Sequence, residues 1–513
     1  MFFNFIVNHK IPALSWLAKI TKDAKGIDIV MGHKVEHTEN AFVSGAWDGP
    51  FSSMDFQNAN FACCTGGKIH GPHNAIFSTP THMQQYIFLI NSNLHGGGVV
   101  ILSNSLPFLL AATGLSLDPN HFTYEEDFDS TIRGFVNCIK HTRLSDNHVL
   151  QIYRYCSISI DHDLKITSYY HDKHLSFDDF TSYRNTLQNV ARRIVANATD
   201  KSRKYKYGLV TSMSRGYDSV ATSVIAKEVG CDISLHFSGP KKYLADDGRN
   251  IAKHLGFKHI IGRDANKYLR RTDSVEAEIF CTGDPGGFCQ FTTFEDYYSN
   301  CIYFSGDFGE NLWERVNLNL NNFLDFSVGG TFSCVSTEME HFLRTGTIYL
   351  SLPSIGANDL LKLSKITKSP EMANWTLYNY YDRPIARRIV EEAGIDREEF
   401  GKTKVGGGNS VHYTTMKTLR KKLSPTSYED FIHFKKNEVK YSRFKFALFT
   451  LNYFWKERAV FVNTLCSRIK IKYRMNGRKL GKHSSPIMNL LILWSNDRLT
   501  KRYKKELTQD KII

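Results

Sequence analysis

A stretch near the middle of the chain constrains the fold most, because it joins an apolar run, a short polar loop and a helical pattern. Residues 209–213 are mostly apolar, and after the loop Val220 and Val224 recur at helical spacing until Gly230. The intervening residues 214–219 read Ser-Arg-Gly-Tyr-Asp-Ser and fall at the N-terminus of that helix. A strand, a tight loop and a helix in this order predict a parallel α/β sheet with a ligand site at the end of a strand.

The loop has the chemistry of an anion site. Backbone N–H groups and the positive end of a helix dipole favour phosphate, and Gly216 lets a phosphate approach the backbone closely. Asp218 is unfavourable beside phosphates unless a cation lies between them, so we expect it to bind Mg²⁺. An ordinary strand-to-helix turn would explain the glycine and the serines but not the aspartate.

The loop is similar to the Ser-Gly-Gly-x-Asp-Ser signature of the N-type ATP pyrophosphatases, and its surroundings resemble the synthetase domain of the asparagine synthetase and β-lactam synthetase family. The resemblance implies that the ATP phosphates contact Ser214, Arg215, Gly216, Tyr217, Asp218 and Ser219. Arg215 stands where a glycine is usual. We expect its guanidinium to add a phosphate contact; the alternative is that its bulk marks a loop that has lost its nucleotide.

The chain continues in the order that this family requires. Residues 231–237 and 258–262 are predicted strands on either side of a predicted helix over 245–255, which gives a doubly wound parallel sheet. The resemblance places Leu235 and Ser238 beside the adenine. The alternative is that Leu235 is a core residue and Ser238 a turn residue.

A second segment, residues 301–313, resembles the Ser-Gly-Glu-Gly-Ala-Asp-Glu segment of the family. The resemblance places Gly306 in the nucleotide site, gives Asp307 a catalytic role toward the incoming amine, and lets Glu310 share Mg²⁺ with Asp218. Because Mg²⁺ demands oxygens at roughly 2.0–2.1 Å, direct binding by the longer glutamate requires the backbone to recede or a water to intervene. The alternative is a strand followed by a helix whose start favours acidic residues.

A third segment begins with a predicted amphipathic helix bracketed by Pro384 and Gly394, followed by a glycine-rich loop that carries two lysines. In the family, a lysine in an equivalent loop stabilises the anionic transition state. Lys404 is the better match and Lys402 the second choice. Lysine and glycine also favour solvated linkers, which is the alternative.

The front of the chain is rich in predicted strands, at residues 85–91, 98–103, 149–160 and 164–170, with a helix over 106–115. This layout resembles the N-terminal glutaminase module of asparagine synthetases, in which a cysteine exposed by methionine removal is the nucleophile. Phe2 stands at that position here, so we expect no glutamine hydrolysis. The neighbouring Cys63 and Cys64 are predicted to be buried small residues.

Composition fits a globular α/β chain of two or three domains: 513 residues, 42% hydrophobic and 23% charged. We expect a degenerate Ntn-hydrolase-like domain over 1–170, a doubly wound ATP pyrophosphatase domain over 171–410, and a basic helical extension over 411–513. Ten cysteines without zinc-type pairs, and no signal segment near residue 1, predict a reduced cytoplasm. The apolar residues 99–117 contain polar breaks, which favours a buried strand and helix over a membrane span.

The positive charge lies at the end of the chain. Residues 401–513 hold 26 Lys and Arg against 7 Asp and Glu, and the other 400 residues hold 39 against 44. Aromatic and aliphatic residues alternate with these cations. Three interpretations stay open: peripheral contact with the anionic inner face of a membrane, RNA binding, or a helical appendage with a solvated basic face.

The function that these resemblances imply is ATP- and Mg²⁺-dependent amide formation. The carboxylate of a small molecule or a sugar becomes an acyl-adenylate, pyrophosphate leaves, and ammonia or an amine releases AMP. The nitrogen comes from free ammonia, from an amine donor or from a separate glutaminase. Two other classes stay open: an ATP pyrophosphatase that modifies RNA bound by the basic tail, and an inactive relative that serves as a scaffold.

Overall fold

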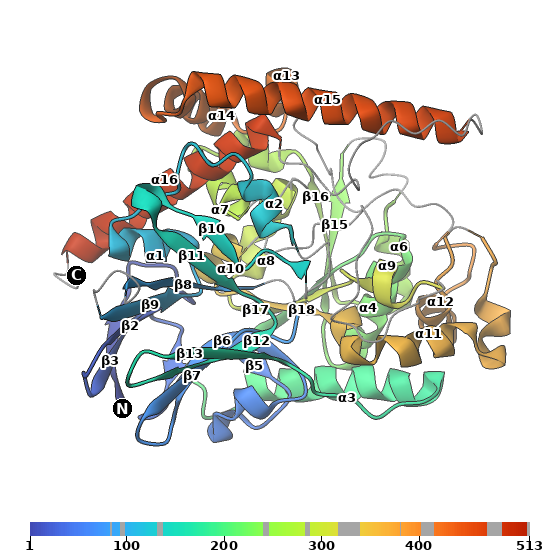
Figure 1. Cartoon of the computed structure of the whole chain (residues 1–513). Coiled ribbons are helices and arrows are strands. Elements are labelled where there is room, and N and C mark those ends of the chain that lie inside the picture. Colours follow the sequence, from blue (N-terminus) through green and yellow to red (C-terminus); the bar gives the residue numbers. More distant parts are fainter. Residues whose placement is uncertain are drawn as a thin grey trace.

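The computed structural model is an α/β structure with three β-sheets and a set of C-terminal helices (Figure 1). For residues 288, 456, 457 and 459–468 it describes the backbone alone. The described residues are 1–82, 85–92, 98–130, 137–239, 246–282, 288–315, 339–379, 381–401, 415–468 and 485–509.

Two sheets form the front of the chain. The first has the order β1-β3-β2-β9-β8-β11-β10, and all its pairs are antiparallel except β1 with β3. Its strands are β1 (Phe2–Asn8), β2 (Trp16–Thr21), β3 (Gly26–Gly32), β8 (Ile87–Asn91), β9 (Val99–Ser103), β10 (His141–Arg143) and β11 (Val149–Tyr153).

The second sheet is antiparallel throughout and has the order β13-β12-β7-β6-β5-β4. Its strands are β4 (Glu36–His37), β5 (Ala41–Trp47), β6 (Ala62–His70), β7 (Asn74–Ser78), β12 (Cys156–Asp161) and β13 (Ile166–Tyr170). The two sheets share one apolar core, in which Trp16 of the first sheet stacks on Phe77 of the second at 6.1 Å between ring centroids. Alternate side chains of strands such as β2 and β5 supply this core, and the others enter separate cores on the outer faces, so both sheets are partly buried on two faces.

The structure confirms most of the predicted elements in this part and corrects one. Strands β8, β9 and β13 and helix α1 (Leu106–Thr113) lie where they are predicted. The run over 149–160 is not one strand: it divides at Arg154 and Tyr155, where Tyr155 has a φ of +52°. The division lets the chain leave the first sheet with β11 and enter the second with β12. Cys63 and Cys64 are buried in β6, as predicted.

The third sheet is parallel, with the order β16-β15-β14-β17-β18. Its strands are β14 (Gly208–Ser212), β15 (Ile233–Ser238), β16 (His259–Asp264), β17 (Cys301–Ser305) and β18 (Ile348–Ser351). Alternate residues of β17 enter different cores: Ile302 and Phe304 pack on the side of the long helices, and Tyr303 packs on the other. The sheet is therefore covered on both faces, as the doubly wound pattern predicts.

One side of this sheet carries α3 (Phe180–Ala198), α4 (Tyr217–Glu228), α9 (Gly309–Leu312), α11 (Leu360–Lys368) and α12 (Pro384–Glu392). The other side carries α8 (Glu295–Tyr298) and α10 (Met339–Thr345). Helix α6 (Arg249–His254) precedes β16 and matches the later half of the predicted helix. Helix α3 also packs on β5, so it connects the parallel sheet to the second antiparallel sheet (Figure 1).

The C-terminal helices differ in how deeply they are buried. They are α13 (Met416–Arg420), α14 (Pro425–His433), α15 (Arg443–Arg468) and α16 (Pro486–Gln509). Helix α16 packs on α1 and on α7 (Glu276–Phe280), and its Tyr503 stacks on Phe108 at 4.8 Å. The buried Glu278 accepts hydrogen bonds from Arg344 and Arg502, which fixes α16 further. Helix α15 instead runs along the outside of the molecule (Figure 1).

Within the described part of the chain, none of the helices combines the length and the hydropathy needed to cross a bilayer. Residues 99–117, which are apolar, form β9 and the buried helix α1, as predicted.

Candidate functional site

The loop over 214–219 lies at the point where the parallel sheet reverses its direction of growth. From β14 the chain proceeds outward through β15 and β16, then returns to add β17 and β18 on the other edge of β14. The loops after β14 and β17 therefore leave neighbouring strands at the same end of the sheet, and the helices that follow them, α4 and α9, pack on the same face. In doubly wound sheets this crevice is where ligands bind.

Hydrogen bonds of two serines close the loop. The Ser214 and Ser219 hydroxyls lie 3.0 Å apart, the Gly216 N–H donates to Ser214 Oγ at 3.0 Å, and the Ser214 N–H donates to Ser219 Oγ at 3.2 Å. Gly216 is the N-cap of α4, and no side chain among the described residues caps that helix. The N-terminal end of α4 therefore keeps the electrostatic character that favours an anion.

The segment after β17 packs directly against Asp218. A Cβ atom on Gly306 would lie 2.7 Å from the carbonyl carbon of Asp218, and one on Gly309 would lie 2.5 Å from its Cγ. Both contacts are shorter than any side chain tolerates, so only glycine fits at either position. This contact brings Glu310, which follows Gly309 at the start of α9, toward Asp218.

Asp218 and Glu310, the two predicted Mg²⁺ ligands, converge on Arg383. The Arg383 Nη1 donates to Asp218 Oδ2, and its Nη2 lies 3.6 Å from Glu310 Oε2. The Arg383 side chain is only 3% exposed. Burial acts to lower the pKa of Arg383, but the Asp218 carboxylate opposes it and the pKa lies above its ordinary value. The site therefore holds a buried, permanently charged cation between two carboxylates.

The position of Arg383 in the sequence indicates that this residue has an acidic partner, although none of the three motifs gives Arg383 a role. Arg383 is the N-cap residue of α12, and Pro384 is the first residue of the helix. A cation at a helix N-terminus is unfavourable, because the helix dipole is positive there. Such a placement indicates an acidic partner elsewhere in the chain, and the structure identifies that partner as Asp218.

The donor set fits Mg²⁺. Carboxylate oxygens are the ligands that this ion prefers, and both carboxylates face one small volume that already accommodates a cation. Arg383 already occupies the Oδ2 oxygen of Asp218. Magnesium binding through that oxygen requires the Arg383 guanidinium to release it, for example toward the phosphates that accompany the ion.

Arg215, which differs from the family pattern, points away from the loop. Its Nε donates to the carbonyl oxygen of Glu399 at 2.7 Å, and its own carbonyl oxygen accepts from the Gly401 N–H at 2.8 Å. The loop is thus tied to the segment after α12. The bulk of Arg215 does not fill the loop, and its phosphate contact stays a prediction.

Tyr217 is a core residue of the site. Its ring packs on Tyr381 at 4.8 Å and on Phe400 at 5.7 Å, and its hydroxyl accepts a hydrogen bond from Arg387. Gly401, with a φ of +65°, approaches the Tyr217 ring so closely that a Cβ atom would lie 2.4 Å away. The side chain therefore anchors the start of α4, while any contact with the phosphates falls to the backbone.

Asp307 lies beside the same crevice. Its carboxylate accepts a hydrogen bond from the Tyr349 hydroxyl, and its N–H donates to Ser305 Oγ at 3.2 Å. Burial raises the pKa of Asp307 above its ordinary value, against the effect of the Tyr349 and Ser305 hydrogen bonds. Raised carboxyl pKa values are typical of groups that exchange protons with a ligand. Sequence reasoning missed Tyr349, which reaches Asp307 from the neighbouring strand β18.

The remaining predicted residues divide into two groups. Leu235 is buried in the core between β14, β15 and β17, and the carbonyl oxygen of Ser238, at the end of β15, accepts from the Ala265 N–H at 3.1 Å. Their contact with adenine stays a prediction. Lys402 and Lys404 lie outside the described residues. One further residue was missed: Asp246, whose carboxylate accepts from the Arg215 N–H at 3.0 Å.

In comparisons with known proteins, no protein-family model matches this chain, and no curated sequence is significantly similar to it.

Proposed function

We propose that this protein is an AMP-forming, ATP-dependent ligase that joins a carboxylate to ammonia or an amine. The observation that carries the proposal is the convergence of Asp218 and Glu310 beside the N-terminal end of α4, at the switch point of the parallel sheet. This position supplies what a magnesium nucleotide needs: backbone N–H groups for phosphate, and carboxylates for the metal.

The reaction has two steps. A substrate carboxylate oxygen attacks the α-phosphorus of ATP, an O–P bond forms, and the bond to the β-phosphate oxygen breaks, so that pyrophosphate leaves. The amine nitrogen then attacks the acyl carbon, a C–N bond forms, and AMP leaves with its oxygen. Mg²⁺, when held by Asp218 and Glu310, would neutralise phosphate charge in this process.

The residues of the chain take separate roles in this proposal. Residues 214–219 bind the phosphates, and Arg383 balances charge between the two carboxylates and the phosphates. Asp307, whose raised pKa suits proton exchange, accepts a proton from the amine as it attacks. Lys404 stabilises the anionic transition state, a role that depends on the resemblance alone. The nitrogen comes from ammonia or an amine in solution, or from another protein.

A second candidate function follows from Arg383 itself. A buried guanidinium that already neutralises Asp218 can replace the metal permanently, in which case the protein is an inactive relative that serves as a scaffold. The two candidates differ in one property. The ligase must let Mg²⁺ and nucleotide displace Arg383 from Asp218, and the scaffold binds neither.

The test is isotope exchange between pyrophosphate and ATP with Mg²⁺, over a panel of small and sugar carboxylates. We expect one class of carboxylate to promote exchange, and Asp218→Ala to abolish it. The matched control is Asp178→Ala, which removes an exposed aspartate just before α3 and leaves exchange unchanged. Absence of exchange with every carboxylate, together with absence of nucleotide binding, would establish the scaffold instead.

A further inference from the structure

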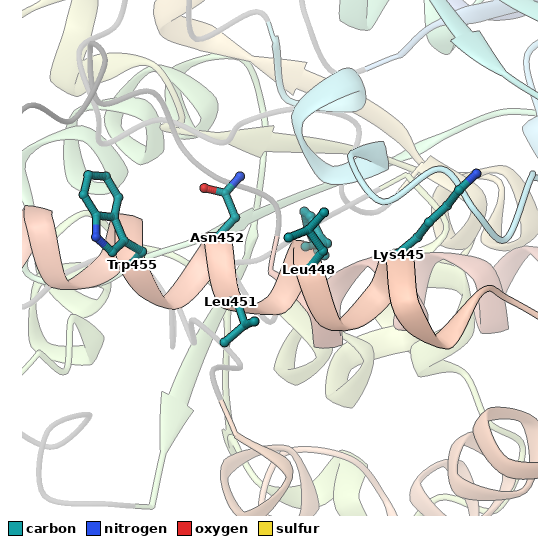
Figure 2. A pocket seen from close by; sticks show the side chains of 6 residues that line it. Lys445, Leu448, Leu451, Asn452 and Trp455 are labelled. Carbon is teal, nitrogen blue, oxygen red and sulfur yellow. The ribbon is translucent and has the colours of Figure 1, made fainter.

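Helix α15 exposes a stripe of large apolar side chains. Phe444, Leu448, Leu451, Phe454 and Trp455 are each between 53% and 79% exposed. At about 100° per residue, Phe444, Leu448, Leu451 and Trp455 fall within about 60° of one side of the helix. Figure 2 looks onto this side, where Lys445, Leu448 and Trp455 follow one another along the helix and line one shallow hollow. We call Phe444, Leu448, Leu451 and Trp455 the apolar stripe.

The opposite side of α15 already has its partner inside the molecule. Phe446 and Phe449 pack on Phe122 at 5.6 and 5.4 Å between ring centroids, and Tyr453 is buried. The Ser442 N–H, just before the helix, donates to Asn120 Oδ1 at 2.8 Å. The helix is thus fixed to the body through one face. The apolar stripe points away from the body and is not needed to hold the helix in place.

Basic residues flank the stripe. Arg443 and Lys445 fall on its two sides at the start of the helix, and Arg458 follows one turn after Trp455; all three are exposed. Residues 443–456 of α15 include no acidic residue, and the sequence places Glu457 after the stripe. Long basic side chains on the edges of an apolar stripe match a helix that lies in the plane of a membrane. There the apolar side chains enter the acyl region, and the cations reach the headgroup phosphates.

We propose that the apolar stripe of α15 docks on the surface of a lipid bilayer that contains anionic phospholipids. The charge pattern separates this occupant from the two others. A second copy of the chain would bring Arg443 and Lys445 against like charges, which is unfavourable. RNA would find phosphate contacts, and bases could stack on Phe444 and Trp455, but Leu448 and Leu451 lie between these rings and offer no stacking surface. A bilayer uses both the aliphatic residues and the cations.

The test is sedimentation of the full chain with vesicles of phosphatidylcholine, alone or mixed with phosphatidylserine. We expect binding to the mixed vesicles. Because each apolar side chain contributes roughly tenfold to partitioning, Leu448→Ser, Leu451→Ser and Trp455→Ser together weaken binding by a factor of about 1,000. Arg443→Glu with Lys445→Glu weakens it by at least about 25-fold, since each basic residue contributes about fivefold and each added carboxylate is repelled by the anionic surface.

Matched controls come from β13, at the edge of the second sheet, and from the residue just before it. Tyr169→Ser removes an aromatic ring that is 53% exposed, and Lys165→Glu reverses an exposed charge. Both variants are expected to bind the mixed vesicles as the wild type does. The stripe variants change only the outward face of α15, so their urea midpoints are expected to match that of the wild type. This result separates lost docking from lost folding.

A second readout places one residue in the lipid. Trp455 is the exposed member of six tryptophans: four are buried, and Trp375 packs under the Arg388 guanidinium at 4.4 Å. Brominated acyl chains are therefore expected to quench Trp455, and Trp455→Phe removes that quenching.

Three results would overturn the proposal: no wild-type binding to mixed vesicles, binding that survives the triple serine variant, or quenching unchanged in Trp455→Phe. A dimer that the triple variant dissolves would assign the stripe to a second copy. An RNA mobility shift that only the charge reversal abolishes would assign the face to nucleic acid. Either finding, without vesicle binding, also overturns it.

Discussion

Replacing Arg383 by methionine tests whether the two carboxylates of the site form a cation-binding pair. The Arg383 side chain is 3% exposed and that of Asp218 is 19% exposed, so their ion pair is mostly shielded from water. Removing one partner of a buried ion pair costs about 3–5 kcal/mol. Because Asp218 keeps some hydration, we expect Arg383→Met to lower the free energy of unfolding by about 3 kcal/mol, at the lower end of this range.

Magnesium should reverse much of this loss. Without Arg383, Asp218 and Glu310 lie close together with no cation between them, and a divalent ion that binds only the folded state at 100 times its Kd stabilises by about 2.7 kcal/mol. In the wild type, Mg²⁺ must first displace the guanidinium, so its effect without nucleotide is smaller. Adding Asp218→Ala to Arg383→Met removes a metal ligand, and the response to Mg²⁺ should disappear.

The assay is urea unfolding in EDTA and in Mg²⁺, followed by circular dichroism. Arg388→Met is the matched control: it lies on the same helix and pairs with Glu371 and Glu392, away from the loop. It should show no difference in magnesium response from the wild type. If Mg²⁺ stabilises Arg383→Met no more than it stabilises the wild type, the reasoning that Asp218 and Glu310 form a metal site is refuted.

Three further changes test other parts of the structure. Burial raises the pKa of Glu340 from 4.5 to about 8, so the folded state holds a proton that the unfolded state has lost between these values. Stability should then fall with rising pH by about 1.4 kcal/mol per unit in that window, and Glu340→Gln should remove this fall in urea titrations at several pH values. Gly306→Ala should destabilise by about 1–3 kcal/mol and weaken nucleotide binding, whereas Gly208→Ala, where the nearest atom lies 3.8 Å from the added Cβ, should do neither. Arg203→Met leaves the buried Glu36 without its ion pair and should lower the free energy of unfolding by about 3–5 kcal/mol; a loss below about 1 kcal/mol would contradict this.

The parts that sequence reasoning could predict are those in which local pattern decides the structure. The loop over 214–219 lies between an apolar run and a helical repeat, and it forms where predicted, between β14 and α4. The helix α12 is predicted by Pro384 at its start and Gly394 after its end, and it extends over Pro384–Glu392. In each case the signal and the structure lie within about four turns of helix.

None of the seven strands in the first 78 residues, β1 to β7, was predicted. In β5 and β6, close packing and not propensity sets part of the sequence. Strand β5 contains Gly45 and β6 contains Gly66 and Gly67, residues that weaken a strand prediction. The structure explains them: a Cβ atom on Gly45 would lie 2.2 Å from the carbonyl oxygen of Cys63, and one on Gly67 would lie 2.7 Å from the Phe42 ring. These contacts exist only after the strands pair.

The contacts of the site that sequence reasoning missed all join distant positions. Arg383 and Asp218 are separated by 165 residues, and Tyr349 and Asp307 by 42. The motif resemblance identifies Asp218 and Asp307 one at a time, but the sheet order and the position of α12 determine what each carboxylate faces. A single sequence contains no direct record of either.

The measurement that tests the central proposal most directly is isothermal titration calorimetry of ATP into the purified protein, with and without Mg²⁺. The account predicts saturable binding to one site that requires Mg²⁺, is abolished in Asp218→Ala and is preserved in Asp178→Ala. Absence of binding by the wild type in the presence of Mg²⁺, or binding that Asp218→Ala leaves unchanged, would contradict it.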